Sequence, residues 1–104
     1  MELWGLKTCD TCRKALAALP GATFRDVREQ PLTPAEIAAL LEQFGPALVN
    51  RASTTWRGLD EEQRALDPAL LLAAHPALMK RPVILTKGDR HLGWNPTVRA
   101  ALGV

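Results

Sequence analysis

The sequence predicts an α/β protein built around a four-stranded mixed sheet, and three observations support this fold class. Residues 1–27 show a strand-like, a helix-like and a second strand-like segment, in that order. A stretch of helical patterns follows over about residues 32–80. Residues 82–102 then show two short strand-like segments and a final helix. The expected order is therefore β-α-β, a helical insert, and β-β-α.

The first strand is expected at residues 2–6 and the first helix at residues 11–19. The helix is expected because its apolar residues recur at the spacing of one buried stripe, formed by Cys12, Ala15, Leu16 and Leu19. Pro20 and Gly21 end this helix, and residues 23–27 alternate like a half-buried strand. Such a β-α-β unit should have parallel strands and a right-handed crossover.

The insert begins with a strong helix start. Thr33 is a good N-cap, Pro34 fits the first helical position, and Glu36 completes a capping box. This helix should reach Phe44. Residues 51–58 are polar, and we expect them to form a loop. Two further short helices are expected after it, at residues 60–66 and 67–75, with Asp60 and Asp67 as their caps.

The C-terminal part predicts an antiparallel hairpin and one helix. Strands are expected at residues 82–86 and 91–94, joined by a turn at residues 87–90. Asn95 caps a final helix that should reach Leu102. The complete element order is that of a thioredoxin-like fold with a helical insertion.

The composition narrows the class of protein. A chain of 104 residues suits one domain, residues 1–104, and its 47% hydrophobic content makes disorder unexpected. The formal net charge of +2, without a run of like charges, gives no reason to expect direct contact with nucleic acid. No apolar run is long enough for a membrane helix, and the N-terminus lacks the basic start of a secretion signal. We expect a cytoplasmic protein, in which paired cysteines are usually catalytic or redox-sensing.

Cys9 and Cys12 form a C-x-x-C pair at the expected start of the first helix. A helix N-terminus presents free N–H groups and a partial positive charge, which lower the pKa of a thiol. Cys9 should therefore be the exposed, attacking thiol, and Cys12, on the apolar stripe, a shielded thiol that resolves mixed disulfides. Arg13 lies one helical turn after Cys9 and can stabilise the thiolate or a bound anion. Thr8 is expected to cap the helix.

Two other interpretations of the cysteine pair stay open. The two residues could be plain small hydrophobic side chains at the start of a helix. A zinc site would need four ligands, and the only other soft candidates, His75 and His91, do not have the spacing of a zinc finger. We expect no metal. The position of the pair at the turn of a β-α-β unit favours redox chemistry.

Four segments resemble characteristic segments of one protein family: Gly5–Ala15, Arg51–Leu59, His75–Ile84 and Leu92–Trp94. The first is similar to the active-site segment of the ArsC-like proteins, the second to their middle loop, and the third to their helix-to-strand segment. The fourth matches the YffB-like and Spx-like branches. The segments occur in the family's order and cover nearly the whole chain. The middle loop is most similar to that of the YffB-like branch.

The resemblance implies a thioredoxin-like fold with a helical insert, and it implies that Cys9 is the nucleophile. In the family's arsenate reductases the matching cysteine binds arsenate covalently, and glutathione and glutaredoxin complete the reduction. Three arginines hold the oxyanion, and two of them match Arg51 and Arg81. The third falls where this chain has Leu92–Trp94, and the loss of one bidentate cation disfavours arsenate as the natural substrate. By analogy with thioredoxin folds, Pro82 should be cis and face Cys9.

Two functions of different classes follow from these observations. The first is a thiol-dependent reductase coupled to glutathione or glutaredoxin, with glutathione as co-substrate, no bound cofactor, and arsenate as one candidate substrate. The second is an Spx-like, redox-switched regulator that binds the C-terminal domain of the RNA polymerase α subunit. The cysteine pair and Gly93–Asn95 favour the regulator. Arg51–Leu59 and the weakly charged C-terminus favour the reductase, which is the function we expect.

Overall fold

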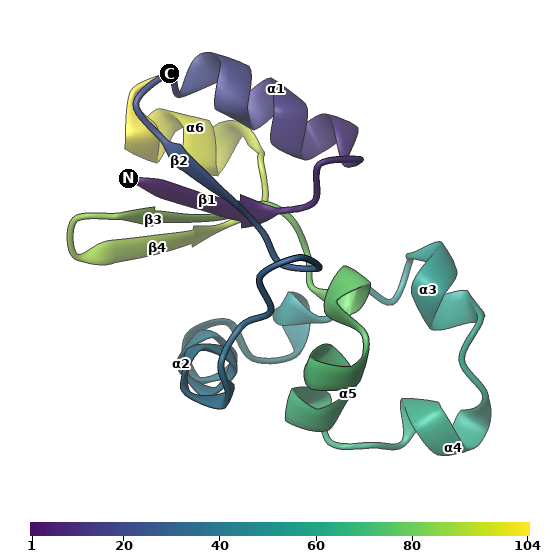
Figure 1. Cartoon of the computed structure of the whole chain (residues 1–104). Helices are drawn as coiled ribbons and strands as arrows, with labels where there is room; N and C mark the ends of the chain where they lie inside the picture. Colours follow the sequence, from purple (N-terminus) through teal and green to yellow (C-terminus); the bar gives the residue numbers. More distant parts are fainter. The chain divides into compact units, whose positions relative to one another are not determined.

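Two compact units make up the chain, and the computed structural model describes all 104 residues (Figure 1). The first unit, called here the sheet unit, combines Met1–Val27 with Arg81–Val104. The second, the helical unit, is Arg28–Lys80. The insert expected over about residues 32–80 falls inside the helical unit. The two cysteines and both chain ends belong to the sheet unit.

The sheet confirms the expected mixed, four-stranded arrangement, with the strand order β2-β1-β3-β4. β1 (Glu2–Gly5) pairs in parallel with β2 (Thr23–Asp26), as the β-α-β pattern predicted. β3 (Val83–Thr86) pairs antiparallel with β1, and β4 (Asp89–Leu92) pairs antiparallel with β3. The two central strands are therefore β1 and β3, which come from opposite ends of the sequence.

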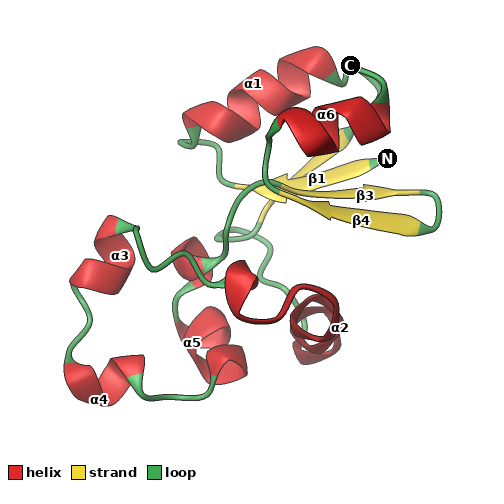
Figure 2. Ribbon diagram, turned by 180° about the vertical axis from the view of Figure 1, so that it is seen from behind, coloured by secondary structure: helices red, strands yellow, loops and turns green.

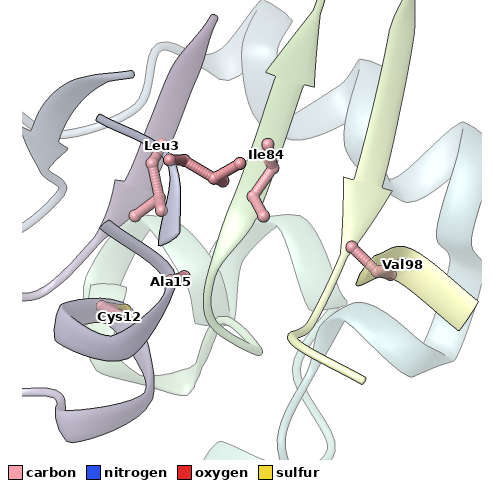
Figure 3. Packing of buried hydrophobic residues seen from close by; sticks show 6 residues of the cluster. Leu3, Cys12, Ala15, Ile84 and Val98 are labelled. Carbon is pink, nitrogen blue, oxygen red and sulfur yellow. The ribbon is translucent and has the colours of Figure 1, made fainter. Parts of the chain in front are cut away.

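Helices α1 (Asp10–Ala18) and α6 (Pro96–Leu102) cover one face of this sheet (Figure 1, Figure 2). Between helices and sheet lies a buried cluster (Figure 3), formed by Leu3, Cys12, Ala15, Leu19, Ile84 and Val98. Three members of the predicted stripe on α1 are in this cluster, and Leu16 packs against it, half-buried. Asn95 caps α6 as expected, because its Oδ1 accepts a hydrogen bond from the Val98 N–H (2.9 Å).

The β3–β4 hairpin has a shorter turn than the sequence predicted. Only Lys87 and Gly88 form the turn, so β4 starts at Asp89, two residues earlier than the expected start at His91. Gly88 adopts a φ of +94°, which glycine reaches without steric cost. Charged Asp89 and Arg90 suggested a turn, but β4 is an edge strand, and exposed positions on an edge strand tolerate charge.

The helical unit contains four α-helices and two 3₁₀ turns: α2 (Pro34–Phe44), α3 (Thr54–Arg57), α4 (Glu61–Arg64), α5 (Pro68–Ala74), η1 (Gly45–Leu48) and η2 (Pro76–Leu78). The capping box of α2 is confirmed, because Thr33 Oγ1 accepts from the Glu36 N–H (3.1 Å) and the Thr33 N–H donates to Glu36 Oε1 (2.8 Å). Asp60 and Asp67 cap α4 and α5, as expected. Each of these helices is started by a residue next to it in sequence.

The expectation of a loop over residues 51–58 is wrong, because α3 forms within this segment. Ser53 Oγ caps it by accepting from the Trp56 N–H (3.1 Å). Nη2 of Arg64, from the next helix, donates to the carbonyls of Trp56 and Arg57, at 3.2 Å each. Arg64 thus binds the last two carbonyls of α3, which have no partner within so short a helix. The segment gave no helical signal because its two threonines have low helix propensity and its stabilising partner is distant in sequence.

Candidate active site

Cys9 is the N-cap of α1, at the end of a short connection from β1. Its backbone N–H donates to the Leu6 carbonyl (3.1 Å), and its own carbonyl accepts from the Arg13 N–H (3.1 Å). The expectation that Thr8 caps the helix is therefore wrong, because the extended backbone of Cys9 is the last non-helical residue and α1 begins at Asp10. Cys9 itself takes the position where the free N–H groups of the first turn gather.

Side chains fix both polar backbone groups of Lys7, two residues before the first cysteine. The Lys7 N–H donates to Asp26 Oδ2 (3.0 Å), and the Lys7 carbonyl accepts from Arg13 Nε (2.9 Å). Arg13 also pairs with Asp10, with 3.5 Å between Nη1 and Oδ1, and its side chain is 64% exposed. The contacts of Arg13 thus hold the connection between β1 and α1. Its expected action on the thiolate stays a prediction.

The pKa of Cys9 lies below its ordinary value. Partial burial of the side chain acts to raise the pKa. Two neighbours lower the pKa and outweigh the effect of burial. Cys12 acts by hydrogen bonding through its backbone and its side chain, and the guanidinium of Arg81 acts by hydrogen bonding and by its charge. The direction of the shift is the one expected for a thiol at a helix N-terminus. Cys9 is therefore a half-buried thiol that ionises more readily than a free cysteine.

The second thiol has the opposite character. Cys12 is fully buried, and burial raises its pKa to about 12, with a further increase from the neighbouring Cys9. The backbone of Leu6 and the charge of Arg81 act in the other direction without reversing the shift. The Cys12 sulfur lies so close to β1 that a Cβ atom added at Gly5 would overlap it. The pair therefore combines one readily ionised thiol with one that stays protonated at neutral pH.

The register of the sheet brings Arg81 to the site. β3 runs antiparallel to β1 with Val83 opposite Trp4, so the residues just before Val83 lie beside the end of β1. The Arg81–Pro82 peptide bond is cis, as expected from the fold. Pro82 is buried, and its carbonyl accepts a hydrogen bond from the Gly93 N–H (2.8 Å). This hydrogen bond and the pairing of β3 with β1 hold the segment, and the Arg81 guanidinium acts on Cys9.

Arg51, the other predicted anion ligand, belongs to the helical unit. Its Nη1 donates to the Pro46 carbonyl (3.3 Å), and its guanidinium lies 5.3 Å from the centroid of the Trp56 ring. Arg64 lies over the same ring, at 5.5 Å. These cation–π contacts give Trp56 a packing role in its own unit. A role for Arg51 in binding an anionic substrate stays a prediction.

Two residues that shape the site were missed by reasoning from the sequence. Gly5 makes room for the Cys12 sulfur, and Asp26 anchors the backbone of Lys7. The signal for the first was available, since a glycine inside a strand often marks a close approach of another group. Asp26 gave no local signal, because it reaches the connection only through the parallel pairing in which it lies opposite Gly5.

The chain has neither a metal-binding cluster nor a membrane-spanning helix. No three side chains among His, Cys, Asp and Glu gather in a way that could hold a metal ion. His75 follows α5 and His91 lies in β4, in different units of the chain. None of the helices has the length and apolar character needed to cross a membrane.

Comparison with known sequences gives a match to one family over almost the whole chain. The model of the ArsC family matches residues 4–101. An uncharacterised protein from Haemophilus influenzae is 39% identical to this chain, and the match covers 91% of each sequence.

Several solved structures are similar to this one. A protein named YffB has a TM-score of 0.88 and 34% identity, over 96% of each chain. An arsenate reductase-related protein from Brucella melitensis has a TM-score of 0.73 and 32% identity, over 99% of this chain and 94% of its own. An arsenate reductase from Vibrio cholerae, at 21% identity and a TM-score of 0.73, covers 89% of this chain and 90% of its own, and shares the fold.

Proposed function

The chain belongs to the ArsC family, and from this premise we propose that it is a thiol-dependent reductase whose nucleophile is Cys9. One observation carries the proposal: Cys9 and Cys12 occupy one helix start with pKa values shifted in opposite directions. A lowered pKa supplies thiolate for attack, and a raised pKa keeps the partner protonated until it is needed. Two free thiols of this kind suit a reducing compartment such as the cytoplasm.

The first step of the proposed reaction is an attack on a disulfide substrate. The Cys9 thiolate attacks one sulfur, the substrate S–S bond breaks, and the other sulfur leaves as a thiolate. The product is a mixed disulfide between Cys9 and the substrate. Arg81 stabilises the thiolate before the attack, because its guanidinium carries a positive charge and hydrogen-bonds to the sulfur.

The second step uses Cys12. While Cys9 is a thiolate, its charge adds to burial in raising the pKa of Cys12. Formation of the mixed disulfide removes that charge, so the pKa of Cys12 falls at the moment when its attack is required. Cys12 then loses its proton to solvent, attacks the Cys9 sulfur and releases the second substrate thiolate. Glutathione or glutaredoxin, as the external reductant, returns the Cys9–Cys12 disulfide to two thiols.

The substrate we propose is a glutathione mixed disulfide, with glutathione as co-substrate. Arg81 supports an anionic substrate, and Arg13 and Arg51 are the further candidates for binding its carboxylates. Arsenate is the weaker candidate. The family's third arginine falls within Leu92–Trp94, and this chain has no cation among those three residues.

Alkylation with iodoacetamide at pH 7, followed by mass mapping, tests the proposal. We expect Cys9 to react faster than a cysteine in an unfolded peptide and Cys12 to remain unmodified. A Cys12→Ser variant is the matched control, since it should keep the fast alkylation of Cys9 and accumulate mixed disulfides. Equal reaction rates for Cys9 and an unfolded-peptide cysteine would contradict the proposal.

A turnover assay separates the candidate substrates and the rival function. Reduction of a glutathionylated peptide and of arsenate is followed in parallel, with glutathione as the reductant. We expect Cys9-dependent turnover of the peptide and little turnover of arsenate. No turnover of either substrate, together with disulfide-dependent binding to the RNA polymerase α C-terminal domain, would establish a redox-switched regulator instead.

A further inference from the structure

Gly5, the last residue of β1, is buried and lies against the side chain of Cys12. A Cβ atom at this position would overlap the Cys12 sulfur and would come within 3.3 Å of the Cys12 Cβ. By contrast, Gly21, also in the sheet unit, has no atom within 4 Å of the position that a Cβ would take. The Cys12 sulfur thus occupies the space that a side chain at position 5 would need.

We propose that Gly5 is a positioning residue for the second thiol: the absence of its side chain lets Cys12 Sγ lie against β1, facing Cys9. This inference rests on the proposed function, because it concerns the step in which Cys12 attacks the Cys9 mixed disulfide. It adds a residue that acts mainly on that step, through the placement of the attacking sulfur.

The neighbours of the Cys12 sulfur leave little freedom for it to move. Its side chain is fully buried within the cluster that also contains Leu3 and Ile84 (Figure 3). It interacts with the backbone of Leu6 and with the Cys9 thiol. A side chain occupies one of three staggered positions about χ1. A methyl group at Gly5 would block the present one, and the others turn the sulfur away from its present neighbours.

The strand itself cannot easily move to make room. The Gly5 carbonyl accepts a hydrogen bond from the Val27 N–H (2.9 Å), and β1 is paired with strands on both sides. The same rigidity holds the connection to Cys9, since Lys7 is bound by Asp26. A methyl group at Gly5 should therefore displace the Cys12 sulfur rather than the strand, and the cost should fall on the second step.

A chromogenic disulfide, dithiobis(nitrobenzoate), resolves the two steps in one experiment. The Cys9 thiolate attacks the reagent, its S–S bond breaks, and one nitrothiobenzoate leaves. Cys12, after losing its proton to solvent, attacks the Cys9 sulfur and releases the second nitrothiobenzoate. Two thiols are oxidised to one Cys9–Cys12 disulfide, and the reagent is reduced to two coloured thiolates. The first release reports on Cys9, and the second reports on Cys12.

We expect Gly5→Ala to leave the rate of the first release within about threefold of the wild type and to slow the second release by about tenfold. A loss of that size is expected when an attacking atom is displaced by less than about 1 Å. Gly21→Ala, the matched control, should change neither phase. A second release unchanged in Gly5→Ala would overturn the inference and leave the proposed function standing. Absence of the first release from the wild type would overturn the proposed function, and the inference with it.

A double-mutant comparison keeps the inference testable where Gly5→Ala folds poorly. Cys12→Ala removes the sulfur, and Gly5→Ala then adds a methyl group to the vacated space. We expect the urea midpoint of Gly5→Ala/Cys12→Ala to equal or exceed that of Cys12→Ala alone, and that of Gly5→Ala to fall below the wild type. If Gly5→Ala lowers the midpoint equally with and without the Cys12 sulfur, the methyl group clashes elsewhere and the inference is wrong.

Discussion

Different kinds of interaction stabilise the sheet unit and the helical unit, each within itself. In the sheet unit, β1 pairs with β2 and with β3, which joins residues from opposite ends of the chain. In the helical unit, the α-helices start at local caps, formed by Thr33, Ser53, Asp60 and Asp67. The charges differ as well. The sheet unit has eight Lys or Arg against four Asp or Glu, and the helical unit has five against seven.

This difference fits the location of the proposed chemistry. A reactive thiol needs a positive environment, and the sheet unit carries the excess of positive charge and the helix start that contains Cys9. It also needs groups fixed relative to one another, which long-range strand pairing provides. The register of β1 with β3 carries Arg81 to the cysteine pair, and no local sequence feature could do so. Local capping, in contrast, fixes a helix without fixing its neighbours.

The largest expected effect comes from removing the reactive thiol. Cys9→Ser should lower the rate of alkylation at pH 7 by at least about a thousandfold, because Cys12 cannot replace it. With a pKa of about 12, Cys12 would be thiolate in on the order of one molecule in 10⁵ at pH 7. Mass mapping after iodoacetamide treatment measures this directly. Rapid modification of Cys12 in the variant would show that its thiol is not shielded.

The next largest effect should be on the stability of the sheet unit. Ile84 is fully buried in the cluster between the sheet and its helices, so Ile84→Ala should reduce the free energy of unfolding by about 2–4 kcal/mol. Leu70 in the helical unit is 59% exposed and provides the matched control, with an expected change below about 0.5 kcal/mol for Leu70→Ala. Urea unfolding of both variants measures the contrast. Similar losses in the two variants would argue against a core that lies between the sheet and helices α1 and α6.

Removing the positive charge at Arg81 should have a moderate effect on reactivity. In Arg81→Met the pKa of Cys9 should rise, because a hydrogen bond and a favourable charge are lost. The alkylation rate should therefore fall about fivefold at pH 7, because the lost hydrogen bond is worth about 1 kcal/mol. The rate should recover at high pH, where the thiol is ionised in both proteins.

Arg13→Met is the control for this charge effect. Arg13 binds the Lys7 carbonyl and pairs with Asp10, so its loss should change the rate with a neutral reagent less than the loss of Arg81 does. A pH–rate profile of alkylation distinguishes the two variants. Equal displacement of both profiles would show that Arg13 also acts on the thiolate.

The smallest expected effect concerns a local cap. Thr33→Ala breaks the capping box of α2 and should reduce the free energy of unfolding by about 1 kcal/mol. The alkylation rate of Cys9 should not change, because Thr33 belongs to the helical unit. Asn95→Ala, which removes the cap of α6, gives the corresponding measurement in the sheet unit. A change of Cys9 reactivity in Thr33→Ala would contradict this expectation.

Local features of the sequence predicted much of this fold correctly. The capping box at Thr33, the cap at Asn95 and the buried stripe on α1 all depend on residues within one or two helical turns. The two failures, α3 and the start of β4, have a common origin. Arg64 from the next helix binds the last two carbonyls of α3, and the register of β4 is set by its pairing with β3. Neither partner is visible in a short window of sequence.

Some features of the candidate site could likewise be predicted from local sequence, and others could not. The position of Cys9 at a helix start and the burial of Cys12 followed from the order of residues, because both depend on α1 and its apolar spacing. The cap was misassigned to Thr8, since a shift of one residue at a helix start costs too little for sequence preference to decide it. The resemblance to the ArsC-like proteins, rather than any pattern in the chain, singled out Arg81.

The sequence by itself determined the caps that start α2, α4, α5 and α6, which face of α1 is buried, and which cysteine lies at the helix start. Those outcomes depend on interactions between residues close in the chain, whose preferences are the same in almost any fold. The tertiary structure alone decided that Gly5 makes room for the Cys12 sulfur and that Asp26 anchors Lys7. These contacts exist only after strands distant in sequence have paired, because pairing, and not local preference, fixes which side chains meet.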